Sequence, residues 1–245
     1  MSVSEVAMVN VFNDTSEAQI LLICEHASNF IPAKFNALGL TQQQLESHIA
    51  WDPGAIETAQ EMAILLDAPL ISAPVSRLIY DCNRPPESPT AIPLASEHQP
   101  IPGNASLCEA DKLSRVTGYY RPFEAAVAKK VASMEMPLII TIHSFTPVFL
   151  GQRRQVEIGV LHDKDSRFAD AFLHQVSTDT RFNIQRNQPY AATDGVTHTL
   201  KHHALPRGLA NVMLEIRNDL IASPAQRAQM ASYLAKHLVL ASQRI

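Results

Sequence analysis

The stretch LIITI, residues 138–142, decides the fold class, because it is a short apolar run of the kind that forms a strand covered on both faces. A similar run lies at residues 19–24, and two more lie at 156–161 and 209–216. Amphipathic segments separate these runs along the chain. Buried strands that alternate with amphipathic segments are typical of an α/β architecture, which the sequence therefore predicts.

Helices and loops between the runs are predicted from their end signals. A helix should begin near Asp52. The last helix should begin at Ser223-Pro224-Ala225-Gln226, which combines an N-cap serine, a proline at the first helical position and a capping-box glutamine. Residues 69–71 and 78–80 are predicted as short strands. Six prolines between Arg84 and Asn104 forbid a regular helix or a central strand, so we expect an ordered loop there.

Length and composition exclude several classes of protein. The 245 residues, 46% of them hydrophobic, suit one domain over residues 1–245, with two small domains as the alternative. The net charge of −4 without a basic block excludes nucleic acid as an expected partner. No stretch approaches the roughly 18–20 apolar residues of a membrane span, and residues 1–17 lack the pattern of a signal peptide. Three irregularly spaced cysteines indicate a reducing, cytoplasmic setting.

Histidines follow two of the apolar runs, where strands should end. Ligands of open α/β sheets bind at the carboxyl ends of the strands, so these residues are candidates for a site. The first run leads into Glu25-His26, and LIITI leads into His143-Ser144. A neutral imidazole there is a natural zinc ligand, although a hydrogen-bonded structural histidine explains each one alone. Two histidines and a carboxylate would leave one zinc position for water.

Asp52 and Glu25 are the two candidates for that carboxylate. Asp52, in Trp51-Asp52-Pro53-Gly54, has a structural explanation, because Asp followed by Pro is a common helix start. Glu25 adjoins His26, and neighbouring side chains of an extended strand point to opposite faces. Unless the chain turns, Glu25 and His26 cannot face one metal. We therefore predict Asp52 as the third ligand beside His26 and His143.

Glu215 lies on another apolar run and is the candidate general base. Period two places Glu215 and Arg217 on one face of the predicted strand. A buried carboxylate is costly without a partner, so the two could form a structural ion pair. The alternative is that Glu215 accepts a proton from the attacking water.

The segment from Ser76 to Arg84 supplies candidates for substrate binding. An arginine fork can bind a carboxylate through two hydrogen bonds, and an asparagine can add directed ones. The candidates are Arg77, Asn83, Arg84 and Arg217, with Arg84 also expected to polarise the reacting carbonyl. Arg77, Asp81 and Arg84 could instead form a solvated charge cluster. The proline-rich loop that follows favours a binding role, because it would fix Arg84 at a loop entrance.

These segments, in this order, resemble the N-formylglutamate amidohydrolase family. No segment is specific alone, but their joint order between Leu21 and Leu220 is. The matching segments are Glu25-His26-Ala27-Ser28-Asn29, Trp51-Asp52-Pro53-Gly54-Ala55, residues 76–85, His143-Ser144-Phe145-Thr146-Pro147, Asn187-Gln188-Pro189-Tyr190 and residues 215–220. The family's better-known branch has Pro-His-Ser-Gly at the first histidine, so this chain resembles a divergent branch.

The resemblance implies hydrolysis of an N-acyl, formyl-type amide on an acidic amino acid, as in amino-acid degradation. It implies a zinc carboxypeptidase-like, phosphorylase/hydrolase-like fold, in which helices flank a central mixed, mostly parallel sheet. It also implies a divalent metal, zinc in such proteins, at the strand ends. Asp81, Asn83 and Arg84 match an element that holds a substrate carboxylate in related deacylases, and Glu215 matches their catalytic glutamate. The expected partner is a small N-acyl amino acid.

Three alternatives stay open at this point. The chain could be a carboxylate-binding relative without turnover, or a zinc deacylase of a different N-acyl amino acid. It could also be a cysteine hydrolase that uses Cys24 or Cys82. One of His198, His202 and His203, which precede the Glu215 strand, could enter the pocket, and surface positions are the alternative.

Overall fold

Three buried strands form the centre of a seven-stranded sheet. The computed structural model describes residues 9–245, so the first eight residues of the predicted non-signal segment lie outside it. The central strands are β2 (Ile20–Cys24), β6 (Leu138–Phe145) and β11 (Asn211–Arg217), which run parallel side by side. These are the apolar runs on which the prediction rests, and their side chains are almost wholly buried.

Shorter strands extend the sheet in the order β1-β3-β2-β6-β11-β9-β10. On one side, β3 (Leu70–Ser72) pairs parallel to β2 and β1 (Asn10–Phe12) pairs antiparallel to β3. On the other side, β9 (Ile158–Leu161) is antiparallel to β11, and β10 (Ile184–Arg186) is parallel to β9. The sheet is therefore mixed and mostly parallel, which confirms the predicted fold class.

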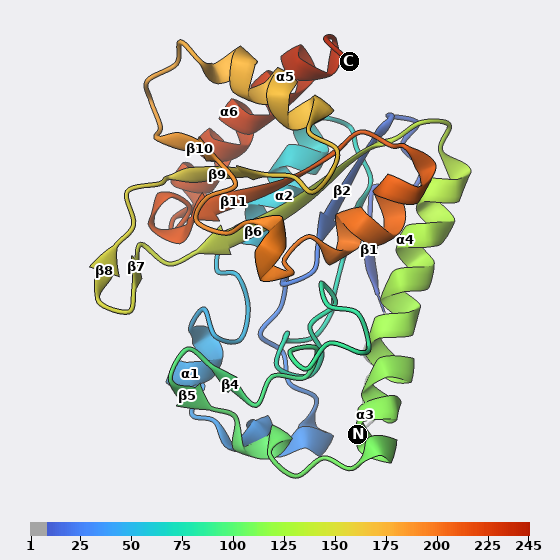
Figure 1. The fold of residues 1–245 in the computed structure, drawn as a ribbon, viewed down its shortest axis with the longest axis vertical. Helices are drawn as coiled ribbons and strands as arrows, with labels where there is room; N and C mark the ends of the chain where they lie inside the picture. The colour runs from blue at the N-terminus through green and yellow to red at the C-terminus, as the bar shows by residue number, and fades with distance from the viewer. Residues whose placement is uncertain (1–8) are drawn as a thin grey trace.

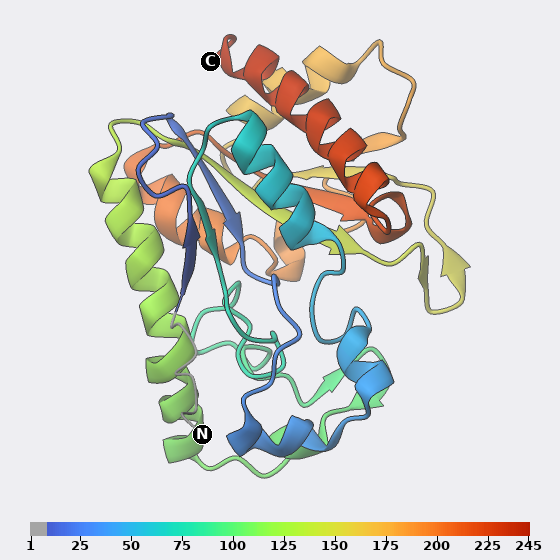
Figure 2. The ribbon, with the colours of Figure 1, turned by 180° about the vertical axis from the view of Figure 1, so that it is seen from behind.

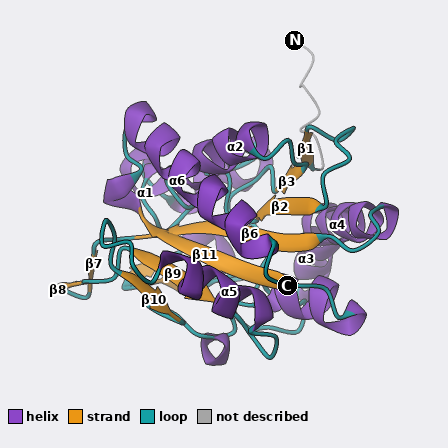
Figure 3. Ribbon diagram, turned by 90° about the horizontal axis from the view of Figure 1, so that it is seen from above, coloured by secondary structure: helices purple, strands orange, loops and turns teal. Residues whose placement is uncertain are grey.

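Helices cover both faces of the sheet (Figures 1 and 2). On one face, Leu22, Ile140 and Leu214 pack against α2 (Ala55–Leu65), α5 (Arg167–Val176) and α6 (Pro224–Ser242). On the other face, their strand neighbours Leu21, Ile139 and Met213 pack against α4 (Arg121–Ser133) and the π-helical turn Leu200–Ala204. Figure 3 shows the sheet between these two layers.

The last helix has the predicted start. Ser223 is its N-cap and accepts a hydrogen bond from the Gln226 backbone, and the Gln226 side chain accepts one from the Ser223 backbone. The helix expected near Asp52 is α2, whose N-cap is Gly54. Within residues 9–245, no helix combines the length and the apolar composition needed to cross a bilayer.

A loop-rich layer lies below the sheet in Figure 1, where the chain leaves β2. It contains α1 (Gln42–Glu46), the small hairpin of β4 (Ala95–Ser96) and β5 (Gln99–Pro100), and the predicted proline-rich loop. A separate apolar cluster that includes Leu38, Leu78 and Ile101 holds the layer together. Towards its lower edge, α3 (Glu109–Arg115) continues through a π-helical turn into α4.

The strand predicted at residues 78–80 is wrong, because this segment forms a turn. Side chains replace the partner strand that the prediction assumed. Asn104 donates a hydrogen bond to the carbonyl of Leu78, and Arg115 donates one to the carbonyl of Ile79. The apolar side chains are buried as expected, but their backbone is satisfied by distant residues that the local pattern does not reveal.

Candidate active site

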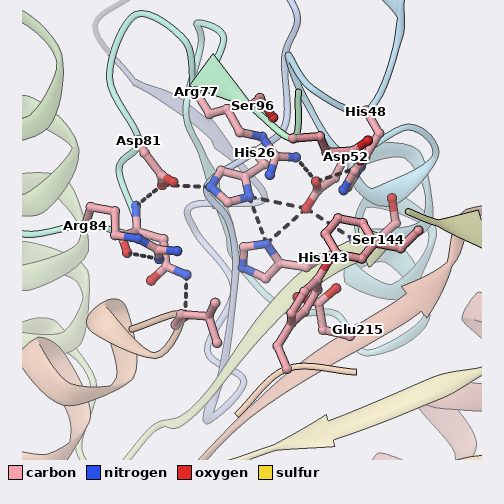
Figure 4. A pocket seen from close by; sticks show the side chains of 15 residues that line it. His26, His48, Asp52, Arg77, Asp81, Arg84, Ser96, His143, Ser144 and Glu215 are labelled. Atoms are coloured by element: carbon pink, nitrogen blue, oxygen red, sulfur yellow. Dashed lines mark hydrogen bonds and ion pairs between the residues drawn. The ribbon is translucent and has the colours of Figure 1, made fainter. Parts of the chain in front are cut away.

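Three side chains bring donor atoms to one point beneath the central strands (Figure 4). His26 lies in the turn after β2, His143 lies within β6, and Asp52 lies in the loop before α2. Asp52 Oδ2 is 3.3 Å from His26 Nδ1 and 3.0 Å from His143 Nδ1, and the two Nδ1 atoms are 3.2 Å apart. All three side chains are buried.

A carboxylate stands behind each of these histidines. Asp81 Oδ1 is 2.7 Å from His26 Nε2 and accepts its hydrogen bond. Glu25 Oε2 is 3.1 Å from His143 Nε2, an ion-pair distance at which the N–H is not aligned for a hydrogen bond. A proton held on each Nε2 leaves the Nδ1 lone pair directed at the shared point. Metal-binding histidines are oriented by partners of this kind.

Burial and neighbouring charges shift the pKa values of the two histidines in opposite directions. Burial, reinforced by the charge of Arg77, lowers the pKa of His26 to about 4, so its imidazole is neutral. Burial raises the pKa of Asp81, but His26 outweighs this effect and the carboxyl stays ionised. Burial likewise opposes the charged forms of His143 and Glu25. Their mutual attraction wins, which raises the pKa of His143 and lowers that of Glu25.

The donor set is suited to a divalent metal. A tetrahedral ion with bonds of about 2.0–2.1 Å separates its ligand atoms by about 3.3 Å, close to the distances found here. His26, Asp52 and His143 form the one group of this kind among residues 9–245. Asp52 does not cap α2, because Gly54 takes the N-cap position without a side-chain hydrogen bond. The helix-start explanation of Asp52 therefore does not account for its side chain.

Asp52 is held by partners on its other side. Its Oδ1 accepts from Arg77 and lies 3.4 Å from His48 Nδ1, and its Oδ2 accepts from the backbone N–H of Ser144 at 3.2 Å. Glu25, the other candidate, faces the rear of His143. The chain does turn after Cys24, as Glu25 would have required. The turn sends Glu25 behind the site and His26 into it.

Glu215 lies beside this group on the neighbouring strand. Its register partner on β6 is His143, and its register partner on β9 is Gly159. The side chain is buried, its Oε2 has no hydrogen-bond partner among residues 9–245, and burial raises the pKa of its carboxyl. The ion pair with Arg217, which was the alternative to a role as base, does not form. Arg217 instead contacts Glu157 and Asp219, at 3.2 and 2.8 Å.

A cavity of about 250 Å³ joins these groups. His26, Asp52, His143 and Glu215 line it, together with Arg77 and Arg84 of the predicted binding set. In Figure 4, Asp81 and Arg84 lie on one side of the two histidines, and Ser144 and Glu215 lie on the other. Arg217 is not among the lining residues. The cavity therefore has an arginine at one end and an unpartnered carboxylate at the other.

The arginine end is built by hydrogen bonds to the segment before Leu200. Arg84 Nη1 donates to the carbonyls of Asn83 and Gly195, both at 2.9 Å, and Nε donates to Thr90 at 3.2 Å. Nη2 has no partner within the described chain. Both ends of the Asn83 amide are used, because it donates to the carbonyl of Val196 and accepts from the N–H of Thr199.

The three histidines before β11 lie outside this cavity. His198 bonds to Tyr120 at 2.8 Å, His202 pairs with Glu124 at 2.9 Å, and His203 is buried. The thiols of Cys24 and Cys82 are also buried, and burial raises the pKa of both well above the usual thiol value. A buried, protonated thiol is a poor nucleophile, which argues against the cysteine alternative.

Several lining residues were not predicted. They are His48, Ser96, Glu97, Ser144, Phe149, Tyr190 and Val196. Most of them come from loops, where no periodicity indicates the direction of a side chain. Asn187-Gln188-Pro189-Tyr190 was part of the family resemblance, and this was the available signal for Tyr190.

Two solved structures are similar to this chain in fold. A solved structure of a gene product from Agrobacterium tumefaciens is 48% identical, covers 96% of this chain and 95% of its own, and has a TM-score of 0.95. The N-formylglutamate amidohydrolase of Ralstonia eutropha JMP134 shares the fold, with a TM-score of 0.61, 18% identity and 96% coverage of both chains. No curated protein matches the sequence.

The sequence model of one family, described as N-formylglutamate amidohydrolase, matches residues 18–222. That range contains every residue that lines the cavity, from His26 to Glu215. The chain therefore belongs to the N-formylglutamate amidohydrolase family and is a hydrolase of amide bonds.

Proposed function

We propose that this protein is a metal-dependent amidohydrolase that removes the acyl group, formyl in the type case, from an N-acylated acidic amino acid such as N-formylglutamate. The convergence of His26 Nδ1, His143 Nδ1 and Asp52 Oδ2 beside an unpartnered Glu215 carboxylate carries the proposal. Family membership supports the amide-hydrolase part of it.

His26, Asp52 and His143 would hold the metal, which we propose to be zinc because two imidazoles and a carboxylate suit this ion. When bound, the ion would activate a water molecule and polarise the acyl oxygen of the substrate. Asp81 and Glu25 keep the protons on the far nitrogens of the histidines. Arg77 balances the charge of Asp52 and holds its orientation.

Glu215 is the proposed general base. A base needs a carboxylate oxygen that reaches the cavity and a pKa near the working pH, and Glu215 lines the cavity, forms no hydrogen bond within residues 9–245 and has a raised pKa. It accepts a proton from the attacking water and later passes it to the nitrogen of the leaving amino acid. Its position on β11 beside His143 fixes this oxygen on a rigid strand.

Arg84 is the proposed site for a substrate carboxylate. Its hydrogen bonds to Gly195 and Asn83 fix the guanidinium, while Nη2 is left for a ligand. Asn83 contributes by positioning, because its amide holds the segment that carries Val196. Arg77 donates its hydrogen bond to Asp52 and contributes positive charge to the cavity. Arg217 contributes to the fold beside Glu157.

The test combines metal analysis with a substrate panel. Purified protein, stripped and then reloaded with zinc, is assayed for formate release from N-formyl-L-glutamate and for amine release from other N-acyl amino acids. Glu215→Gln should lower kcat by at least about 10³-fold while the bound zinc stays at the wild-type level. The exposed Glu61→Gln on α2 is the matched control and should leave kcat unchanged.

Each outcome separates the alternatives. Full activity of Glu215→Gln would show that the base assignment is wrong. Activity on another N-acyl amino acid, with none on N-formylglutamate, would identify a deacylase of different specificity. Zinc-loaded protein that binds N-formylglutamate without releasing formate would identify a binding relative instead of an enzyme.

A further inference from the structure

The loop that carries Tyr190 lies directly beside Glu215. Gly159, the β9 register partner of Glu215, has no side chain, and the carbonyl of Gln188 fills the space. A Cβ at Gly159 would lie 2.0 Å from that carbonyl oxygen, so the approach requires glycine. Asn187 fastens the loop at the same place, because its N–H donates to the carbonyl of Val160 at 3.0 Å. The strand that abuts Glu215 therefore also positions Tyr190.

Arg154 contacts both the ring and the hydroxyl of Tyr190. Its guanidinium carbon lies 5.0 Å from the centre of the Tyr190 ring, 4.6 Å from that of Phe149 and 5.3 Å from that of Phe145. One terminal nitrogen donates to the Tyr190 hydroxyl at 3.0 Å, and the other donates to the carbonyl of Thr146 at 3.4 Å. Cation–π contacts and directed hydrogen bonds of this kind fix a phenol in one orientation.

The hydrogen bond from Arg154 determines which further hydrogen bond the Tyr190 hydroxyl can form. Arginine has only donors, so the phenolic oxygen must accept the hydrogen bond from Arg154. The phenolic proton is then free for another acceptor. Tyr190 lines the same cavity as Glu215 and His143, and no protein acceptor for this proton is found among residues 9–245. A substrate oxygen is the acceptor that the cavity would supply.

We infer that Tyr190 donates a hydrogen bond to the acyl oxygen of the substrate as the tetrahedral adduct forms, and that Arg154 is its positioning residue. The inference rests on the proposed function and adds a residue to it. Tyr190 is set beside Glu215, where the reacting carbon must lie, whereas Arg84 forms the opposite end of the cavity. Tyr190 therefore contacts the acyl group, and Arg84 is left for the carboxylate.

The protonation of Tyr190 agrees with a donor role. Burial and the nearby Glu215 carboxylate raise the pKa of the phenol, and they outweigh the opposite effect of Arg154. The hydroxyl therefore keeps its proton at neutral pH. During the reaction the water oxygen bonds to the acyl carbon, and the carbonyl π pair moves to the acyl oxygen. Glu215 takes the proton of the water. When the C–N bond breaks, that proton goes to the leaving nitrogen and the second water proton stays on the new hydroxyl, which yields a carboxylic acid and a free amine.

Tyr190→Phe isolates the hydroxyl, because it keeps the ring under Arg154. Loss of one donor to a developing oxyanion costs about 10²-fold or more in kcat, so we expect such a fall with KM within about threefold of wild type. Affinity for the methylphosphonamidate of glutamate, an analogue of the tetrahedral adduct, should fall in parallel. Tyr233→Phe is the matched control, because that hydroxyl is on α6 and has no hydrogen-bond partner in the described part of the chain. It should leave both measurements unchanged.

Arg154→Met tests the positioning role through a double-mutant cycle. Alone it should lower kcat by at least about tenfold, and in the Tyr190→Phe background it should cost no more than about twofold. Equal losses in both backgrounds would overturn the positioning role. A Tyr190→Phe variant with wild-type kcat, or with a loss confined to KM, would overturn the inference while an active wild type upholds the proposed function. An inactive wild type would overturn both.

Discussion

The carboxylates behind the two histidines allow a sharp test of the proposed metal centre. In Asp81→Asn the amide oxygen can still accept from His26 Nε2 and from the backbone N–H of Asn83, which lie 2.7 and 2.9 Å from it in the wild type. The substitution therefore removes the charge and keeps the shape. Glu25→Gln makes the same change behind His143.

The expected magnitude follows from what the two charges do. Replacing a carboxylate that orients a metal-binding histidine costs 10- to 100-fold in metal affinity, or about 1.4–2.7 kcal/mol. Asp81 has an aligned, short hydrogen bond to His26, so its substitution should lie near the upper value. The contact of Glu25 with His143 is longer and not aligned, so its substitution should lie near the lower value.

Stability of the metal-free protein should fall in both variants. Glu25 is fully buried, and its attraction to His143 outweighs the desolvation cost of its charge, which lowers its pKa. Glu25→Gln removes this attraction and leaves His143 without its buried partner, so the metal-free variant should be less stable than wild type. Asp81→Asn should lose stability, because it weakens two buried hydrogen bonds to an ionised acceptor.

The assay is zinc competition against a chromophoric chelator at pH 7.5, paired with urea unfolding of the metal-free proteins. Asp165→Asn, which alters a surface ion pair with Arg167, is the control and should bind zinc like wild type. Wild-type zinc affinity in a folded Asp81→Asn variant would refute the role given to the carboxylate. Absence of zinc binding in the wild type would refute the metal centre itself.

Other predictions concern the rest of the chain. Zinc at about 100 times its Kd should stabilise the wild type by about 2.7 kcal/mol, seen as a rise of Tm by roughly 5–10 °C that His143→Ala abolishes. Burial lowers the pKa of His203 to about 4, so its imidazole is neutral in the folded protein. The free energy of unfolding should therefore be at its full value above pH 6.5 and fall by up to about 3 kcal/mol as the pH drops towards 4. Urea unfolding of His203→Gln should show a smaller loss. Gly54→Ala should cost about 2–4 kcal/mol in the same assay, because φ is +81° there and the added Cβ would lie 2.6 Å from the carbonyl oxygen of Ile221.

The central strands could be predicted because runs of consecutive apolar residues indicate their burial. Runs that are covered on both faces are almost entirely apolar, as at 138–142, where Thr141 is the one polar residue, and the N-cap of α6 is equally local. Residues 78–80 show the limit of this reasoning. Their apolar side chains are buried, but Asn104 and Arg115 supply the hydrogen bonds that a neighbouring strand would have made.

Strand ends were harder to place than strands. His143 was expected to follow the run 138–142, yet it lies inside β6, which continues to Phe145, whereas Glu215 lies within β11 as predicted. Both side chains are buried because each faces the other polar groups of the site. Sequence patterns treat a polar residue as the end of a buried strand, whereas a functional site can place one within it.

The ambiguity over Asp52 illustrates a different limit. The motif Asp-Pro-Gly has a local explanation as a helix start, and nothing in the sequence shows that α2 begins instead at Ala55 behind an N-cap glycine. The Asp52 side chain instead contacts Arg77, His26, His143 and Ser144, which are up to 92 positions away in the sequence. Such a choice is made by tertiary contacts alone.

The two ends of the cavity are held by different kinds of structure, and this separates the reaction from the substrate. His143 and Glu215 are fixed in buried, hydrogen-bonded strands, so their relative position is set by the register of β6 and β11. Arg84, Tyr190 and Val196, which would contact the substrate, are carried by loops. Loops tolerate change better than buried strands. Shared family membership therefore constrains the chemistry more strongly than the choice of acyl group or amino acid, and a substrate panel is the measurement that the loop residues require.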